Sequence, residues 1–239
     1  MRFLNISLLI LAVFLFGCSN DSSKENRKKK EQAIILGYLL GCQFSSANPL
    51  FSDPYYPRYF SDKKQYDKLI LGDSTMDIAC NSFSGYASSE TGCFPVSGNK
   101  IPDFESQLCV LSTVAPSLII VSTMGGNDIL SQVDDEEIIR RGKSFVSTLN
   151  RKFPNATKVW VKVHPTRVDY ANSHRGKTNS AISDFSISQG WKVTDPDSCF
   201  QTESDGKAVQ SYLLDAIHPN ASTSFCIKNK IKSEHGVEY

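Results

Sequence analysis

The chain alternates short apolar runs with stretches that have helical periodicity. Residues 68–71 (KLIL), Leu118–Ser122 (LIIVS) and 158–163 (KVWVKV) are short enough to be buried strands, and the first two lead into glycine-containing turns. Residues 134–153 begin with acidic and end with basic side chains, an order that suits the dipole of an amphipathic helix. Strands that alternate with helices in this way predict an α/β fold with a parallel sheet.

Weaker patterns continue the alternation toward the C-terminus. Further helices are predicted over 103–113 with Asp103 as the N-cap, over 178–189, over 206–214 and over 220–232, and a short strand over 191–193. In sheets of this kind, function gathers beyond the carboxyl ends of the strands. The two glycine-containing turns are therefore the first place to look for a site.

The first 17 residues resemble a signal peptide. Arg2 supplies the positive start, and the apolar run from Ile6 to Phe16 is shorter than the roughly 20 residues that a membrane-spanning helix needs. The run ends in Leu15-Phe16-Gly17-Cys18, which resembles the bacterial lipobox, where cleavage precedes a cysteine that becomes lipidated. The alternative is an ordinary signal peptide with a chance cysteine near its end.

This N-terminus predicts three parts of the chain. They are a lipoprotein signal peptide over 1–17, a lipidated polar tether over 18–32 and a single domain over 33–239. Such a protein would be lipid-anchored in the cell envelope, in the periplasm or at the outer-membrane surface. With 26 Lys+Arg against 25 Asp+Glu and no dominant basic block, the charge pattern predicts no nucleic-acid partner.

The cysteine count also fits an exported protein. If Cys18 of the seven cysteines carries lipid, six remain as candidates for disulfides: Cys42, Cys80, Cys93, Cys109, Cys199 and Cys226. Six cysteines allow 15 pairings, and the sequence does not select one. We expect local Cys80–Cys93 and Cys199–Cys226 bonds, which leave Cys42 with Cys109. A metal site is not expected, because no CxxC or HxxxH spacing occurs.

A serine, a histidine and a neighbouring carboxylate are the best candidates for catalysis. Ser74 follows the first apolar run in Gly72-Asp73-Ser74, and Asp215 lies three residues before His218 in Asp215-Ala216-Ile217-His218-Pro219. A serine nucleophile needs a base to take its proton, and a histidine base needs a carboxylate that fixes its tautomer. For Ser74 alone, the alternative is a helix N-cap.

The other histidines are weaker candidates for the base. Histidine titrates near neutral pH, so each of them has to be considered. His164 follows the third apolar run and is the only competitor, since His174 is expected in a polar loop and His235 in a frayed C-terminal tail.

The same chemistry needs hydrogen-bond donors for the oxyanion that forms when a carbonyl is attacked. The Ser74 N–H is one candidate. The side-chain amide of Asn127 is another, because Gly125-Gly126-Asn127-Asp128 follows the end of the second strand. The alternative for Asn127 is a turn residue that tolerates a left-handed backbone.

Taken in order, these motifs resemble the four blocks of the SGNH (GDSL-type) hydrolase family. The matching segments lie within 67–220 and are Ile70-Leu71-Gly72-Asp73-Ser74, Val96-Ser97-Gly98-Asn99-Lys100-Ile101, Gly125-Gly126-Asn127-Asp128 and Asp215-Ala216-Ile217-His218-Pro219-Asn220. The second block is the loosest match, and Gly85 competes with Gly98 for its glycine. Gly98 is preferred because a helical pattern follows it.

The resemblance implies a flavodoxin-like, three-layer α/β/α sandwich with a parallel sheet and an exposed active site. It implies that Ser74 is the nucleophile, His218 the general base and acid, and Asp215 the carboxylate that orients the histidine. The oxyanion hole would consist of the Ser74 N–H, the Gly98 N–H and the Asn127 side chain. We expect no cofactor and no metal.

These expectations together describe an envelope-anchored serine esterase that acts on lipid or acetylated-glycan esters through an acyl-Ser74 intermediate. The expected partners are that ester substrate and the membrane, reached through the lipid on Cys18. Two alternatives stay open: an acyltransferase with a glycan acceptor, and a surface lipoprotein that binds without catalysis.

Overall fold

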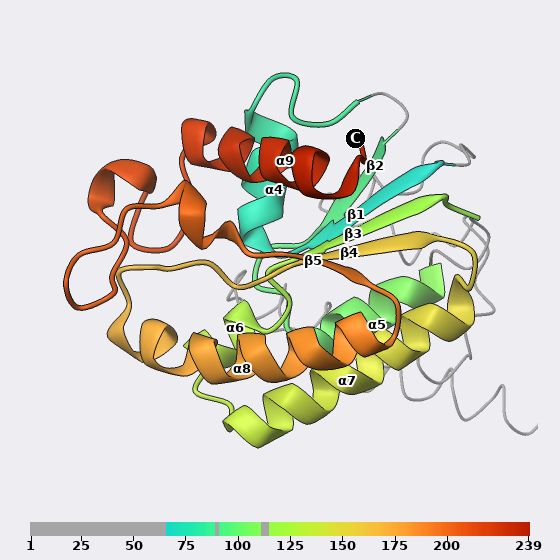
Figure 1. Ribbon diagram of the computed structural model, residues 1–239, viewed down its shortest axis with the longest axis horizontal. Coiled ribbons are helices and arrows are strands. Elements are labelled where there is room, and N and C mark those ends of the chain that lie inside the picture. The colour runs from blue at the N-terminus through green and yellow to red at the C-terminus, as the bar shows by residue number, and fades with distance from the viewer. Residues whose placement is uncertain (1–65, 89–90, 111–114) are drawn as a thin grey trace, which may run out of the picture.

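The computed structural model describes residues 66–88, 91–110 and 115–239 (Figure 1). The predicted signal peptide over 1–17, the tether over 18–32, Cys18 and Cys42 lie outside the described residues, and so does the side chain of Cys109. The anchor and the Cys42–Cys109 pair therefore remain predictions.

Five parallel strands form one sheet in the order β2-β1-β3-β4-β5. The strands are β1 (Lys68–Gly72), β2 (Thr91–Pro95), β3 (Leu118–Ser122), β4 (Thr157–Val161) and β5 (Lys192–Thr194). Because all strands run the same way, their carboxyl ends share one edge, which lies at the left of Figure 1.

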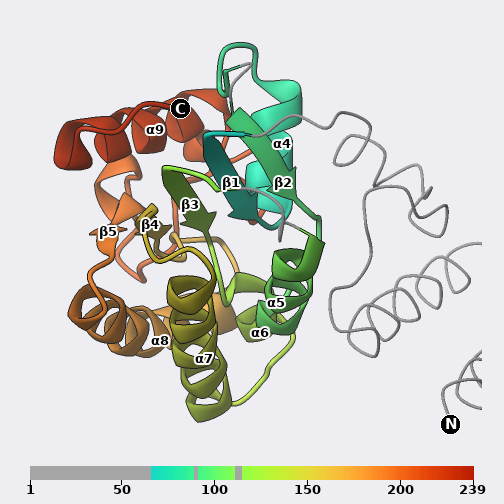
Figure 2. The same cartoon turned by 90° about the vertical axis from the view of Figure 1, so that its right-hand side faces the viewer.

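Helices cover both faces of the sheet. On one face lie α5 (Ile101–Val110), α7 (Asp135–Lys152) and α8 (Asp169–Ser188), with the short α6 (Gly126–Leu130) near the carboxyl edge; on the other face lie α4 (Ser74–Ser82) and α9 (Ala221–His235) (Figures 1 and 2). The molecule is thus the three-layer α/β/α sandwich that we predicted.

Alternation along the strands builds the two cores. Leu69 and Leu71 of β1 point to the α5, α7 and α8 side, while Ile70 between them packs on the α4 and α9 side. Neighbouring β3 repeats the pattern with Ile119 and Ile120. Such strands have to be apolar on both faces, which is why they appear in the sequence as unbroken apolar runs.

The sequence predictions differ from the structure in five elements. The strand β2 and the helix α4 were not predicted, α8 begins nine residues before the predicted 178, and 206–214 contains only the 3₁₀ turn Gln210–Tyr212. The helix α5 begins at Ile101, so Asp103 is not its N-cap; its carboxylate instead accepts a hydrogen bond from the Lys100 N–H at 2.9 Å.

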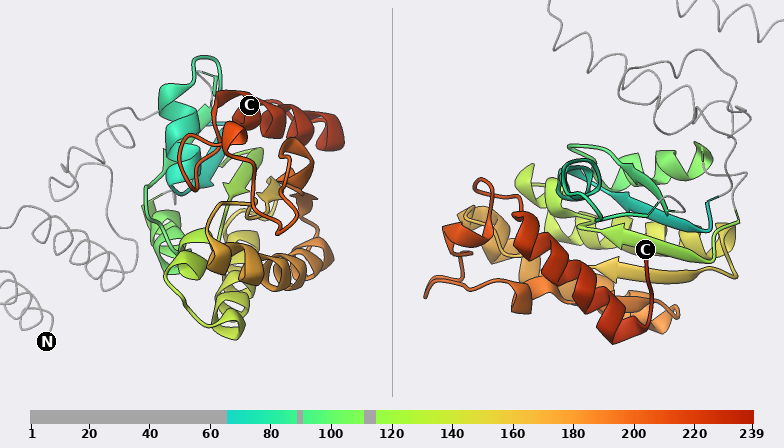
Figure 3. Two further views of the ribbon diagram at one scale, coloured as in Figure 1. Left: turned by 90° about the vertical axis from the view of Figure 1, so that its left-hand side faces the viewer. Right: turned by 90° about the horizontal axis from the view of Figure 1, so that it is seen from above.

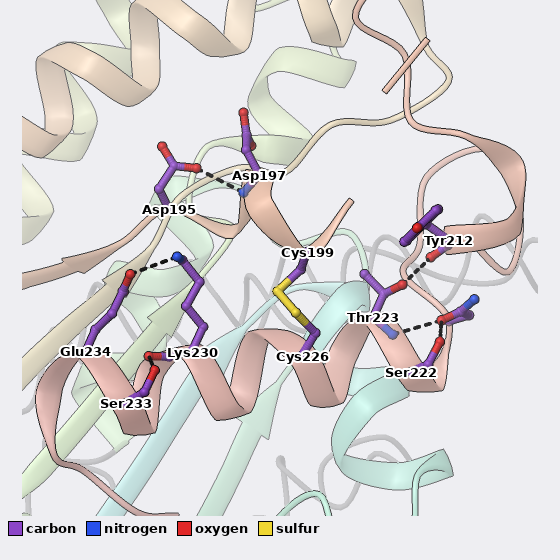
Figure 4. Close-up of a disulfide and its surroundings, with 11 residues drawn as sticks. Asp195, Asp197, Cys199, Tyr212, Ser222, Thr223, Cys226, Lys230, Ser233 and Glu234 are labelled. Carbon is purple, nitrogen blue, oxygen red and sulfur yellow. Dashed lines mark hydrogen bonds and ion pairs between the residues drawn. A yellow bond between two sulfur atoms is a disulfide. The ribbon is translucent and has the colours of Figure 1, made fainter. Parts of the chain in front are cut away.

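Two disulfides confirm the predicted local pairs. Cys80–Cys93 ties α4 to β2 across a Cα–Cα distance of 6.4 Å. Cys199–Cys226 ties the 3₁₀ turn Pro196–Cys199 to α9 across 5.7 Å (Figure 4). The first bond therefore links a helix to the sheet, and the second links a helix to the segment that follows β5.

Two further features of the described residues concern membranes and metals. No helix in 66–88, 91–110 or 115–239 is both long and apolar enough to cross a membrane. The same ranges hold no cluster of three His, Cys, Asp or Glu side chains suited to a metal ion.

Candidate active site

A tight turn at the end of β1 places Ser74 at the start of α4. Asp73 is the N-cap of this helix, and its carboxylate accepts a hydrogen bond from the Thr75 N–H at 2.9 Å. Gly72 allows the turn, because a Cβ atom there would lie 2.5 Å from Cβ of Met76. The sequence had left the N-cap role open for Ser74; the structure gives it to Asp73 and leaves the Ser74 hydroxyl available.

The Ser74 hydroxyl meets His218 from a segment 144 residues away. Nε2 of His218 lies 2.8 Å from Oγ of Ser74, and Nδ1 lies 2.7 Å from Oδ2 of Asp215. The structure therefore brings the three predicted residues together in the order serine, histidine, carboxylate. This order is what proton transfer from the serine to the imidazole requires.

The Asp215 carboxylate is held by more than the histidine ring. Its Oδ1 accepts hydrogen bonds from the main-chain N–H groups of Ile217 at 2.7 Å and His218 at 2.8 Å. Burial raises the pKa of Asp215, but these bonds and the one from the imidazole outweigh it and leave that pKa below its usual value. The carboxylate is thus ionised and able to orient the imidazole at neutral pH.

Main-chain contacts fix the loop that carries this pair. The Leu214 N–H donates to the His218 carbonyl at 2.7 Å, which closes the loop on itself. The Arg167 N–H, from the segment after β4, donates to the Ala216 carbonyl at 2.8 Å. The loop is therefore held at the carboxyl edge by its own turn and by a neighbouring segment (Figure 3, left).

The predicted oxyanion donors lie at the same edge. Asn127 is in α6, and its Nδ2 donates to the Asn99 carbonyl at 3.0 Å and to Oδ2 of Asp73 at 3.2 Å. Both amide hydrogens of Asn127 thus have protein acceptors. To donate to an oxyanion, Asn127 would have to share or release the longer of the two bonds, the one to Asp73.

The structure separates the two candidate glycines of the second block. Gly98 lies in the turn between β2 and α5, and Ser97 beside it donates to Asp77 in the first turn of α4 at 2.9 Å. Gly85 follows the opposite end of α4, where its carbonyl accepts a hydrogen bond from Lys228 of α9. Only Gly98 is at the carboxyl edge, where Ser74 lies.

A buried network around Asp73 was missed by the sequence analysis. Besides Thr75 and Asn127, its carboxylate accepts a hydrogen bond from the Thr123 hydroxyl at 2.7 Å. Thr123 has a φ of 55°, which is unusual for a β-branched residue and points to a constrained position. Burial raises the pKa of Asp73 to about 6, against the opposing effect of these bonds.

This pKa predicts how stability changes with pH in an Asp73→Asn variant. The folded-state pKa of about 6 exceeds the ordinary value of 3.8, so the folded protein holds the Asp73 proton more tightly. The stabilisation that this bound proton provides is complete below pH 3.8 and is lost as the pH rises through the folded-state pKa of about 6. Relative to the variant, the wild type should therefore lose about 2 kcal/mol of unfolding free energy between pH 4 and 7. Urea unfolding of both proteins across this range measures the difference, and a constant difference would show that Asp73 does not titrate as described.

The rival base, His164, is not in contact with Ser74. Its ring is buried, stacks on Phe200 with centroids 5.3 Å apart, and places Nδ1 2.9 Å from the carbonyl of Pro165. Burial lowers the pKa of His164 to about 4, so the ring is neutral at physiological pH. His164 is therefore a buried residue of the core.

The two remaining histidines were placed wrongly by the sequence analysis. His174 lies in α8, with Nδ1 2.9 Å from a carboxylate oxygen of Asp135. His235 ends α9 and lies 2.9 Å from the Thr194 hydroxyl of β5. Both pack between elements of the sandwich, which leaves His218 as the base beside Ser74.

The Cys199–Cys226 disulfide encloses the segment that carries Asp215 and His218, with a sequence separation of 27 residues. Closing a loop of this length lowers the entropy of the unfolded chain and so stabilises the folded protein by about 3–4 kcal/mol. We expect a Cys199→Ser/Cys226→Ser variant to lose that much stability in denaturant unfolding. The Cys80→Ser/Cys93→Ser variant is the matched comparison and should lose less, because its loop spans only 13 residues. A loss below about 1 kcal/mol for the longer loop would contradict this account.

Comparison with known proteins rests on structure alone. No protein-family model matches the chain, and no curated protein has significant sequence similarity to it. Among solved structures, a GDSL-like lipase from Bacteroides thetaiotaomicron is 14% identical with a TM-score of 0.61, and the match covers 72% of this chain and 89% of that one.

Two further solved structures have a similar fold. A member of the lipolytic protein G-D-S-L family from Veillonella parvula is 13% identical with a TM-score of 0.57, covering 71% of this chain and 98% of that one. A catalytic mutant of an acetylxylan esterase from Geobacillus stearothermophilus is 15% identical with a TM-score of 0.54, covering 71% and 94%. The chain has the fold of the SGNH (GDSL-type) hydrolases.

Proposed function

We propose that the protein is a serine hydrolase of the SGNH (GDSL) type that cleaves carboxylic esters through an acyl-Ser74 intermediate. One observation carries the proposal: the Ser74 hydroxyl, the His218 imidazole and the Asp215 carboxylate are joined by contacts of 2.8 and 2.7 Å. A protein that only binds a ligand has no need of this arrangement. The fold it shares with lipases and an acetylxylan esterase supports the same chemistry.

The proposed reaction begins with the imidazole. Asp215 accepts the Nδ1–H of His218, which leaves the lone pair of Nε2 facing the Ser74 hydroxyl. As Oγ of Ser74 attacks the ester carbonyl carbon, its proton passes to Nε2. The resulting imidazolium then protonates the leaving alcohol, and the C–O bond of the ester breaks. Water then attacks the acyl carbonyl carbon as it gives a proton to Nε2 of His218. The C–O bond to Ser74 breaks, the acid leaves, and the imidazolium returns its proton to Oγ of Ser74.

The oxyanion of each tetrahedral intermediate would receive donors from three segments. The Ser74 N–H belongs to the first turn of α4, whose unpaired N–H groups and dipole favour negative charge. The Gly98 N–H and the Asn127 amide complete the set. Since Asn127 is held at 3.2 Å by Asp73 and at 3.0 Å by Asn99, it is oriented before substrate arrives, and the longer bond is the one to be exchanged.

The substrate is proposed to be a lipid or an acetylated glycan at the cell envelope. Solved structures with the same fold are described as a GDSL-like lipase and an acetylxylan esterase, which supports both classes of ester. The envelope location is proposed on the basis of the lipobox-like Leu15-Phe16-Gly17-Cys18, through which the enzyme would be tethered beside its substrate.

Hydrolysis of nitrophenyl esters tests this function. We expect the purified protein to turn over at least one ester in a series from acetate to palmitate, and the acyl length of the fastest ester to separate glycan deacetylation from lipolysis. Dependence of the rate on an added glycan acceptor would instead indicate acyl transfer. No turnover across the series, together with no release of acetate from acetylated xylan, would contradict the proposed function.

A further inference from the structure

Thr123, the residue that follows β3, has a backbone conformation that its own side chain disfavours. Its φ of 55° lies in the left-handed region, where a β-branched residue is an outlier. Such strain persists only where the surrounding structure enforces it, and it is common at functional sites. A glycine would adopt the same conformation without strain. The side chain of Thr123 therefore has to make a contact that a glycine could not.

The main chain of Thr123 begins the turn that carries Asn127. Its N–H donates to the Val161 carbonyl of β4 at 3.0 Å, and its carbonyl accepts a hydrogen bond from the Gly126 N–H at 2.9 Å. Gly126 is the first residue of α6 and directly precedes Asn127. These two bonds fix the start of α6 beside the carboxyl edge of the sheet; β3 and α6 are labelled in Figure 2.

The hydroxyl of Thr123 connects this turn to the turn that carries Ser74. It donates to Oδ1 of Asp73 at 2.7 Å, and the Thr75 N–H donates to the same oxygen at 2.9 Å. The other carboxylate oxygen, Oδ2, accepts a hydrogen bond from Nδ2 of Asn127 at 3.2 Å. Because two donors hold Oδ1, the carboxylate is not free to rotate. The direction from which Oδ2 meets the Asn127 amide is therefore fixed.

Burial separates the residues that a substrate can touch from those that support them. Ser74 and Asn127 are only partly buried. Asp73 and Thr123 are 5% and 3% exposed. A substrate at Ser74 can thus reach the Asn127 amide but not the Thr123 hydroxyl. Thr123 can influence the reaction only through Asp73 and Asn127.

The Thr123 bond also favours the charged form of Asp73. Burial raises the pKa of this carboxyl to about 6, and among the groups that oppose the effect of burial the Thr123 hydroxyl has the largest influence. Without the hydroxyl, the pKa of Asp73 would rise further, and more of the carboxyl would be protonated at neutral pH. A neutral carboxyl is a weaker hydrogen-bond acceptor than a carboxylate, so Asn127 would be held less firmly.

We propose that Thr123 is a positioning residue of the oxyanion hole: through Asp73, its hydroxyl holds the side-chain amide of Asn127 in the orientation that receives the oxyanion. This role rests on the function proposed for Ser74. It also explains the strained backbone, because a glycine at this position would keep the two main-chain bonds but lose the bond to Asp73.

Steady-state ester hydrolysis by three variants at this position tests the proposal. Thr123→Val removes the hydroxyl with little change of shape, and kcat should fall by about ten- to hundredfold while KM stays within about twofold, because an oxyanion donor acts in the transition state. Thr123→Gly also lacks the hydroxyl but relieves the backbone strain, so it should fold and show the same loss. Thr123→Ser keeps the hydroxyl and should restore kcat to within about threefold of wild type.

NMR relaxation of ¹⁵N-labelled protein measures the orientation of Asn127 itself and needs no turnover. The side-chain amide of Asn127, assigned by its absence in Asn127→Asp, should have an order parameter near about 0.85 in wild type and Thr123→Ser, and near about 0.6 in Thr123→Val and Thr123→Gly. Thr178→Val is the matched control, since this buried hydroxyl bonds the carbonyls of His174 and Arg175 within α8 at 3.3 and 3.2 Å. It should leave both the order parameter and kcat unchanged.

Three results would overturn the proposal. They are an unchanged order parameter of Asn127 in both variants that lack the hydroxyl, a wild-type kcat in both of them, and a loss of kcat in Thr123→Ser as large as that in Thr123→Val. If the wild type hydrolyses no ester, the function proposed for Ser74 fails. The order parameters then still decide whether Thr123 holds the Asn127 amide, so the two failures are distinguishable.

Discussion

Replacing Ser74 by alanine is expected to lower kcat for ester hydrolysis by about 10⁴- to 10⁶-fold. The variant removes the oxygen that forms the acyl bond, so no acyl-enzyme can form and only the electrostatic and binding contributions of the site remain. The helix α4 should be unaffected, since its N-cap is Asp73 and its first turn keeps the Thr75 N–H bond of 2.9 Å. Binding of substrate should therefore persist while turnover is lost.

The matched control is Ser82→Ala, an exposed serine at the other end of the same helix. Its kcat should equal that of the wild type, and both variants should unfold at wild-type denaturant concentrations. If Ser74→Ala kept more than about a tenth of wild-type activity, another group would have to be the nucleophile.

The second large effect is expected for Asp215→Asn, with a loss of about 10³- to 10⁴-fold in kcat. Oδ1 of Asp215 accepts two main-chain N–H groups, so the new amide would keep its oxygen there and turn its NH₂ toward Nδ1 of His218. Nδ1 would then have to accept a hydrogen bond, and the proton would move to Nε2. In that tautomer the imidazole cannot take the proton of Ser74.

Steady-state kinetics of Asp215→Asn, compared with those of Asp205→Asn, separate the change of the His218 tautomer from the simple loss of one negative charge. Asp205 is an exposed loop residue whose carboxylate pairs with Lys207 at 2.9 Å and not with His218. Its replacement should leave kcat unchanged. A loss below about tenfold for Asp215→Asn would mean that the histidine is oriented by the loop alone.

Elements with strong periodicity were predictable from the sequence. The β3 run appears in the structure with the predicted bounds, Leu118–Ser122, and α7 spans Asp135–Lys152 inside the predicted 134–153. Both are defined by local signals: a strand buried on both faces has to be apolar throughout, and an exposed helix needs caps and a polar face.

Elements defined by their tertiary contacts were not predictable. The strand β2 reads TGCFP, and its Gly92 packs closely against the rings of Phe94 and Tyr66, a contact that only the folded strand reveals. The first half of α8 is polar, because it is stabilised by contacts such as that between His174 and Asp135. Neither has a pattern that a single sequence displays.

The candidate site likewise has residues that the sequence predicted and residues that it did not. Ser74, Asp215 and His218 were proposed because their chemistry restricts which residue types can do the work and because the motifs occur in order. The network of Asp73, Thr123 and Asn127 was missed, since its members are 50 and 54 residues apart from Asp73 and their bonds exist only after β1 and β3 have paired. Residues that support a site are visible only once the chain is folded.

Covalent labelling with a fluorophosphonate tests the central claim most directly. Such a probe reacts with a serine only when a neighbouring base activates it. We predict that the intact mass of the purified protein increases by a single adduct, that peptide mapping places this adduct on Ser74, and that Ser74→Ala is not labelled. An unlabelled wild type, or an adduct on any other residue, would contradict the proposal that Ser74 is an activated nucleophile.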